Sequence, residues 1–159
     1  MQITRSALAQ MIDHTLLKTD STRAQVAALV AEARELGTFS VCVSPSMLPI
    51  TEELGPVKVA TVCGFPSGNH TPAAKASEAA ESARLGADEI DMVINIGWAK
   101  DHRWDELLAE IKAVREACGE KILKVIIETC MLTDEEKVEL CRIVSASGAD
   151  YIKTSTGFG

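Results

Sequence analysis

The sequence predicts an α/β protein in which parallel strands alternate with helices, of the (β/α)8 barrel class. Apolar runs of strand type alternate along the chain with amphipathic or alanine-rich segments that carry helix start and stop signals. A weak repeat points the same way, because LGAD at residues 85–88 and SGAD at residues 147–150 each precede a strand-like run. The rival is a doubly wound open sheet. That fold usually has a glycine-rich turn after its first strand, whereas residues 16–20 (LLKTD) contain no glycine.

The apolar pattern predicts six strands. They cover residues 12–17, 39–43, 57–63, 89–95, 122–128 and 151–154. A barrel of this class has eight strands, so the pattern accounts for only about the first six β/α units. We therefore expect residues 1–159 to form a single, incomplete barrel domain whose first and sixth strands expose long edges.

Helix signals separate these strands. An apolar stripe between the first two runs predicts a helix that is entered through Asp20 or Ser21 and stopped by Gly37. Thr71 followed by Pro72 opens an alanine-rich helix. The first of these helices would connect the first strand to the second, and the other would connect the third strand to the fourth.

Two further helices are predicted in the second half of the chain. One carries an apolar stripe from Trp104 to Ala117 and ends at Gly119. The other begins at Thr133, because Glu136 three residues later gives the spacing of a capping box. Their positions complete the alternation of strands and helices.

Composition and charge narrow the function classes. The 159 residues are 47% hydrophobic with a formal net charge of −7, which argues against a nucleic-acid or anionic-membrane surface. The five cysteines are odd in number and include no C-x-x-C pair, so neither a disulfide framework nor a zinc site is expected. His14, His70 and His102 have no paired spacing for a metal. Without a signal-peptide core or a membrane-spanning run, we expect a cytoplasmic protein with a small-molecule partner.

Charged residues recur on one face of three neighbouring strands. In the run 89–95 the apolar residues share one face, which leaves Glu89 and Asp91 on the other. The same alternation places Lys124 and Lys153 on the matching faces of the next two strands. If helices cover the outside, Asp91, Lys124 and Lys153 point into one interior, where they must pair or titrate. Either a catalytic site or a structural ion network would fit this pattern.

Lys153 ends a short apolar run and is followed by hydroxyl and glycine residues. An amine attacks a carbonyl only when neutral, and roughly one ordinary lysine in 2,500 is neutral at pH 7. Lowering its pKa to about 7 would require ~4–5 kcal/mol of differential destabilisation of the ammonium, from burial or a nearby cation. The alternative is a lysine that extends from a strand end into solvent.

Several motifs resemble those of deoxyribose-phosphate aldolases, in the same order and through the whole chain. They are IDHTLLK at 12–18, VCV at 41–43, GFPSG at 64–68, GADEIDMVIN at 86–95, KVIIET at 124–129 and IKTSTGF at 152–158. The resemblance implies a (β/α)8 barrel that works without a metal or cofactor. It implies a class I aldolase, which cleaves 2-deoxy-D-ribose 5-phosphate reversibly to acetaldehyde and D-glyceraldehyde 3-phosphate.

The resemblance also assigns roles to residues. Lys153 matches the lysine that forms the Schiff base, and Asp91 the acid/base aspartate that relays protons through a water. Thr15 and Cys42 match positions that line the sugar site, and Thr156 would help to hold the substrate. Cys42 could equally be a small buried hydrophobe on a strand. Lys124 would provide at most a supporting charge near the site.

The departure from the family carries its own expectation. Family members continue for roughly two more β/α units, which hold a second active-site lysine and the loops that bind the substrate phosphate. We therefore expect these residues alone to have little normal aldolase activity. Either a homo-oligomer or pairing with the missing C-terminal segment would cover the open edges. The alternative function is a non-catalytic fragment that acts as a scaffold or a self-associating half-barrel.

Overall fold

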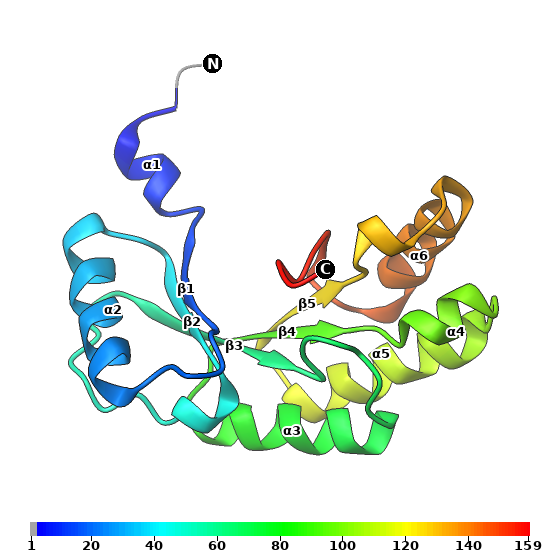
Figure 1. Cartoon of the computed structure of the whole chain (residues 1–159), viewed down its shortest axis with the longest axis horizontal. Coiled ribbons are helices and arrows are strands. Elements are labelled where there is room, and N and C mark those ends of the chain that lie inside the picture. The colour runs from blue at the N-terminus through cyan, green and yellow to red at the C-terminus, as the bar shows by residue number, and fades with distance from the viewer. Residues whose placement is uncertain (1–2) are drawn as a thin grey trace.

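The computed structural model describes residues 3–159, which form one parallel sheet with helices along its outer side (Figure 1). The six strands of this sheet follow each other in chain order. Their bounds are β1 (Asp13–Leu16), β2 (Ser40–Val43), β3 (Lys58–Cys63), β4 (Glu89–Val93), β5 (Ile122–Ile126) and β6 (Tyr151–Lys153). Each lies within one of the runs predicted from the sequence, and every neighbouring pair is parallel. The predicted partial barrel is confirmed.

Helices alternate with these strands. Within residues 3–159 they are α1 (Arg5–Ala9), α2 (Arg23–Leu36), α3 (Pro72–Arg84), α4 (Ile96–Lys100), α5 (Trp104–Cys118) and α6 (Asp134–Ser147), with 3-10 turns η1 (Pro45–Met47) and η2 (Thr129–Met131). The four long helices match the predicted ones. The short helices α1 and α4 are too brief to leave an apolar repeat in the sequence.

The helix ends show why these segments begin and stop where they do. Residue Gly37 ends α2 in the left-handed conformation, as predicted, and Thr133 caps α6 through a full capping box with Glu136. The predicted entry of α2 at Asp20 or Ser21 is wrong. The helix is capped by Thr22, because Thr22 and Gln25 satisfy each other's backbone N–H groups in a capping box.

The hydrophobic core lies between the sheet and the helices. Along β2 to β5, every second residue points outward into this layer and is buried; the central ones are Val41, Val59, Ile90, Met92, Leu123 and Val125. Apolar residues of α2, α3, α5 and α6 cover them, among them Leu29, Ala79, Ile111 and Leu140. The helices therefore cover the outward faces of the strands, and the charged residues of β4, β5 and β6 are left for the inside of the curve.

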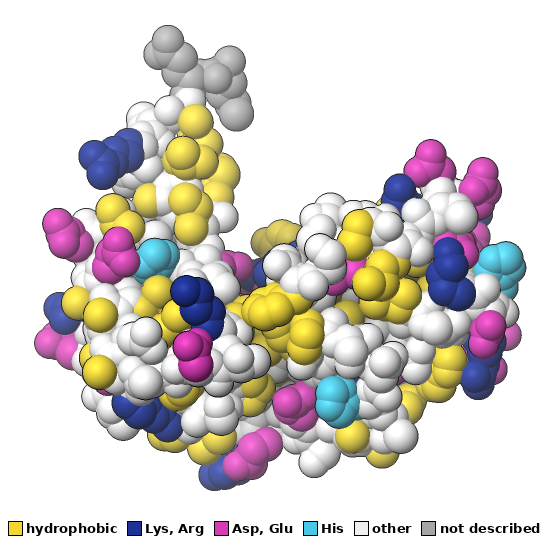
Figure 2. Space-filling model, in the orientation of Figure 1, with side chains coloured by type: hydrophobic (Ala, Val, Ile, Leu, Met, Phe, Trp, Pro, Cys, Tyr) yellow, Lys and Arg dark blue, Asp and Glu magenta, His cyan; other side chains and the backbone are white. Residues whose placement is uncertain are grey.

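The inner face is open on one side. In the described residues β1 and β6 each pair with one neighbour only, so the sheet has two free edges. Ile12 beside β1 is 42% exposed, and Ile152 in β6 is 43% exposed. Figure 2 shows the resulting hollow between α1 and the rest of the molecule, with hydrophobic side chains along α1. None of the helices in residues 3–159 is long and apolar enough to cross a membrane.

Candidate active site

Three strands bring the predicted charged residues together on the inner face. Asp91 on β4 lies in register with Lys124 on β5, and Lys153 on β6 lies beside Ile126 of the same β5 face. The ammonium of Lys153 donates to Asp91 Oδ2 at 2.6 Å, and Lys124 Nζ lies 3.7 Å from Asp91 Oδ1. Lys153 therefore reaches across β5 to a carboxylate two strands away.

Exposure differs sharply within this group. The Asp91 side chain is fully buried, whereas the Lys153 side chain is 36% exposed and lies at the rim. Asp91 Oδ1 accepts no hydrogen bond from any residue of the described chain. A buried carboxylate oxygen without a donor is uncommon, because burial without a hydrogen bond costs free energy. Asp91 Oδ1 thus retains the capacity to accept a further hydrogen bond.

Two further carboxylates complete the cluster, and the sequence did not mark either as a site residue. Lys124 Nζ lies 2.6 Å from Asp13 Oδ2 and contacts Glu89 Oε2. Ser40 Oγ donates to the other oxygen of Asp13 at 2.8 Å. Glu89 could have been found by its two-residue spacing from Asp91. Asp13 is 111 residues from Lys124, and only the curvature of the sheet joins them.

The charges of the cluster keep Lys124 protonated. Burial lowers its pKa, but the charges of Asp91, Asp13 and Glu89 outweigh burial, so the pKa of Lys124 is raised above its usual value. Burial raises the pKa of the Glu89 carboxyl, and the ammonium of Lys124 offsets only part of this effect. Lys124 is therefore a permanent cation that screens three carboxylates from one another.

Two of the predicted sugar-site residues lie on the inner face near this cluster. Cys42 is 1% exposed and packs with Ala60 and Val62 in a small apolar group. Burial, followed by the charge of Asp91, raises the pKa of its thiol to about 12, so Cys42 is neutral. Thr15 lies beside Cys42 in register, and its exposed hydroxyl donates to Asp13 O.

Thr156 lies in the loop after β6 and is bound to Glu128. The Thr156 N–H donates to Glu128 Oε1 at 3.1 Å, and its hydroxyl donates to Glu128 Oε2. The sequence pattern did not mark Glu128, because a residue that departs from strand geometry looks the same in sequence as one that continues the strand.

Two cavities open on either side of the cluster. One of about 410 Å³ is lined by residues from the N-terminal segment and strands β4 to β6, including Asp13, Glu89, Lys124 and Lys153. The other, of about 300 Å³, lies beyond the carboxyl ends of the strands, between the loop after β3 and the loop after β6, and its lining includes Glu128 and Thr156. Barrel enzymes place their chemistry at this carboxyl end.

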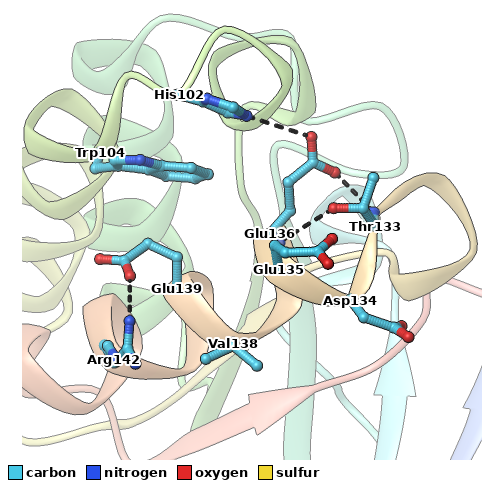
Figure 3. A pocket seen from close by; sticks show the side chains of 9 residues that line it. All are labelled: His102, Trp104, Thr133, Asp134, Glu135, Glu136, Val138, Glu139 and Arg142. Atoms are coloured by element: carbon cyan, nitrogen blue, oxygen red, sulfur yellow. Dashed lines mark hydrogen bonds and ion pairs between the residues drawn. The ribbon is translucent and has the colours of Figure 1, made fainter.

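A larger hollow of about 770 Å³ lies on the outer surface between α5 and α6 and carries no comparable group (Figure 3). Several of its polar residues already have partners. Glu136 binds Lys100 at 2.8 Å and caps α6, and Glu139 pairs with Arg142 at 2.7 Å. His102 stacks on Trp104. Volume alone would favour this hollow, but Asp91, whose buried Oδ1 accepts no hydrogen bond from residues 3–159, lies on the inner face of the sheet.

A second lysine–carboxylate pair lies on the outer side of the sheet and was missed from the sequence. Lys75 of α3 donates to Glu110 Oε1 of α5 at 2.8 Å and to Val93 O at 2.8 Å, and both side chains are fully buried. Glu110 Oε2 accepts from Asn95 N. This pair has all its main bonds satisfied and no access from solvent.

The structure does not gather the histidines. His14 pairs with Glu32 at 2.9 Å, whereas His102 lies on the outer surface beside Trp104. Across residues 3–159, no three His, Cys, Asp or Glu side chains are grouped as ligands of a metal ion.

Comparison with known proteins identifies the family. The family model of DeoC/LacD aldolases matches residues 7–158. A deoxyribose-phosphate aldolase from Kocuria rhizophila is 58% identical over 98% of this chain and 72% of its own length. One from Corynebacterium diphtheriae is 57% identical over 98% of this chain and 71% of its own.

Solved structures agree. A candidate deoxyribose-phosphate aldolase from Coccidioides immitis is 41% identical with a TM-score of 0.91, over 99% of this chain and 63% of its own. The deoxyribose phosphate aldolase from Aeropyrum pernix, described as tetrameric, is 30% identical with a TM-score of 0.88, over 98% of this chain and 67% of its own. The chain thus spans between 63% and 72% of the length of these relatives. It belongs to the DeoC/LacD family of aldolases.

Proposed function

We propose that this chain carries the Schiff-base half of a deoxyribose-phosphate aldolase site, with Lys153 as nucleophile and Asp91 as acid/base. The observation that carries the proposal is the contact of 2.6 Å between Lys153 Nζ and a fully buried Asp91, whose second oxygen has no donor within residues 3–159. An amine at a rim and a carboxylate behind it can exchange a proton in either direction.

The reaction would begin when Lys153 transfers a proton to Asp91 and its nitrogen attacks the aldehyde carbon of 2-deoxy-D-ribose 5-phosphate. The resulting carbinolamine loses water and leaves an iminium ion. Removal of a proton from the hydroxyl at C3 then breaks the C2–C3 bond, releases D-glyceraldehyde 3-phosphate and leaves an enamine on Lys153. Protonation of the enamine carbon and hydrolysis of the iminium release acetaldehyde.

The other residues of the inner face would support these steps. Lys124, held by Asp13 and Glu89, would keep a fixed positive charge beside Asp91. The neutral thiol of Cys42 and the hydroxyl of Thr15 would line the sugar site. Thr156, at the carboxyl end, would lie next to the bound substrate.

Assembly and location form part of the same proposal. The free edges at β1 and β6 would be covered either by another copy of the chain or by a further segment of the barrel. The Aeropyrum pernix relative is described as tetrameric, which makes a homo-oligomer a natural case. All five cysteines are free, which suits a reducing cytoplasm.

The test is reductive trapping. The purified chain would be incubated with acetaldehyde and borohydride, and modified lysines located by mass spectrometry. We expect Lys153 to be modified well before Lys58. Lys58 is an exposed residue at the amino end of β3 and serves as an internal control. Modification at Lys153 no faster than at Lys58 would favour the alternative, a non-catalytic fragment that acts as a scaffold.

Trapping is the appropriate test because we expect turnover of the 159 residues to be low. The inner face is open between β1 and β6, so water reaches Lys153 at the rim and weakens the electrostatic interactions that catalysis requires. Cleavage of 2-deoxy-D-ribose 5-phosphate by this polypeptide at a rate typical of an efficient enzyme would contradict this expectation. Mass measurement in solution would show whether a second copy covers the edges.

A further inference from the structure

The backbone changes direction at Glu128, directly after β5. Glu128 has φ 53° and ψ 67°, which is the left-handed region that residues other than glycine seldom occupy. The pairing between β5 and β6 nevertheless continues on both sides of it. Ile127 N donates to Lys153 O at 3.0 Å, and Thr129 N donates to Thr154 O at 2.8 Å. The strained residue is thus held in place by the backbone that carries Lys153.

The left-handed turn aims the Glu128 side chain at the loop after β6. The residue is 3% exposed, and in the described chain its carboxylate forms no ion pair. Its two oxygens accept from the N–H and the hydroxyl of Thr156. A buried carboxylate needs such donors, and charge-assisted bonds are the stronger ones. Glu128 therefore forms two hydrogen bonds to Thr156, which lies three positions after Lys153.

The same loop is fixed at its far end. Phe158 N donates to the Thr156 hydroxyl at 3.0 Å, so Glu128, Thr156 and Phe158 form a continuous chain of hydrogen bonds. The Phe158 ring packs edge-to-face on Phe65, with ring centroids 5.4 Å apart. The loop 154–158 thus spans from the end of β5 to the loop after β3, across the carboxyl end of the inner face.

We infer that Glu128 is a positioning residue, which locks the loop 154–158 and thereby holds Lys153 against Asp91. This inference rests on the proposed function only for the role of Lys153. The hydrogen bonds by which Glu128 fixes the loop 154–158 do not depend on that role. A residue kept in a strained conformation with both carboxylate oxygens bonded to one neighbour is typical of a functional constraint.

The test replaces Glu128 by glycine, which adopts the left-handed conformation freely and removes the side chain together with its carboxylate. Amide hydrogen exchange of Thr156 and Phe158 is the first readout. We expect exchange about tenfold faster in Glu128→Gly than in the wild type. Glu128→Gln, which keeps one acceptor, should fall between the two. His102→Gly is the matched control, because His102 also has a positive φ, of 56°, but lies on the outer surface.

The second readout is the ratio of trapped acetaldehyde on Lys153 to that on Lys58. This ratio should fall several-fold in Glu128→Gly and stay at the wild-type value in His102→Gly. Unchanged amide exchange at Thr156 in Glu128→Gly would show that Glu128 does not fix the loop 154–158, whatever the labelling ratio at Lys153. Faster exchange with an unchanged labelling ratio would overturn the positioning role. Absence of preferential labelling in the wild type would instead count against the proposed function, and the exchange readout would still decide the lock.

Discussion

Two lysine–carboxylate pairs lie on opposite sides of strand β4, and they differ in what surrounds them. Lys75 and Glu110 lie on the outer side, are both fully buried, and balance each other one to one. On the inner side Lys153 and Lys124 share three carboxylates, and Lys153 is 36% exposed. The outer pair is closed to solvent, whereas Lys153 on the inner side is exposed to it.

The two lysines also differ in what their ammonium groups contact. Lys75 is the more buried of the two, but its ammonium is occupied by Glu110 and by Val93 O. It fixes the end of β4, because Glu110 also accepts from Asn95 N. Lys153 contacts a carboxylate that retains a free oxygen. The outer pair holds the strand that positions Asp91, and the inner pair is available for chemistry.

The largest effect is expected from breaking the outer pair. Lys75→Met leaves the Glu110 carboxylate buried without its cation, which should cost about 3–5 kcal/mol in the free energy of unfolding. Urea denaturation would measure it. The double variant Lys75→Met with Glu110→Gln removes the buried charge and keeps an acceptor for Asn95 N, so it should recover much of the loss. A loss below about 1 kcal/mol in the single variant would show that the pair is not structural.

The next effect concerns the inner pair and should appear in the chemistry. Asp91→Asn keeps the size of the side chain but removes the proton acceptor next to Lys153. The rate of trapping at Lys153 should fall by about a hundredfold, which is typical for loss of a general acid/base. Lys58 gives the reference rate on the same molecule. An equal rate in the variant would mean that another group manages the proton.

A smaller effect follows from the raised pKa of Glu89. Because the folded state raises this pKa, chiefly by burial, the folded chain binds more protons than the unfolded chain between the usual value of 4.5 and the folded value. The contribution of Glu89 to stability therefore falls as pH rises through this window. Glu89→Gln removes this dependence, so its stability relative to the wild type should increase from pH 4 upward and then level off. A difference that stays flat or declines would refute the assignment.

The inner row could be predicted from sequence because strand alternation has a period of two, which fixes which residues share a face. Asp91, Lys124 and Lys153 follow from that rule alone. Partners across helices could not be predicted, since the contact of Lys75 with Glu110 depends on how α3 and α5 pack together. The left-handed turn at Glu128 depends on the tertiary bonds of Thr156. The entry of α2 at Thr22 was missed because a neighbouring Ser or Asp has a similar capping preference.

We propose that Lys153 and Asp91 act together on an aldehyde at the inner face. The most direct test is the exchange of deuterium from heavy water into the methyl group of acetaldehyde, followed by proton NMR. That exchange requires the iminium on Lys153 to lose a proton, pass through the enamine and regain a deuteron. We predict catalysed exchange by the wild-type chain and only the background rate with Lys153→Arg. The same rate with both chains would contradict the account.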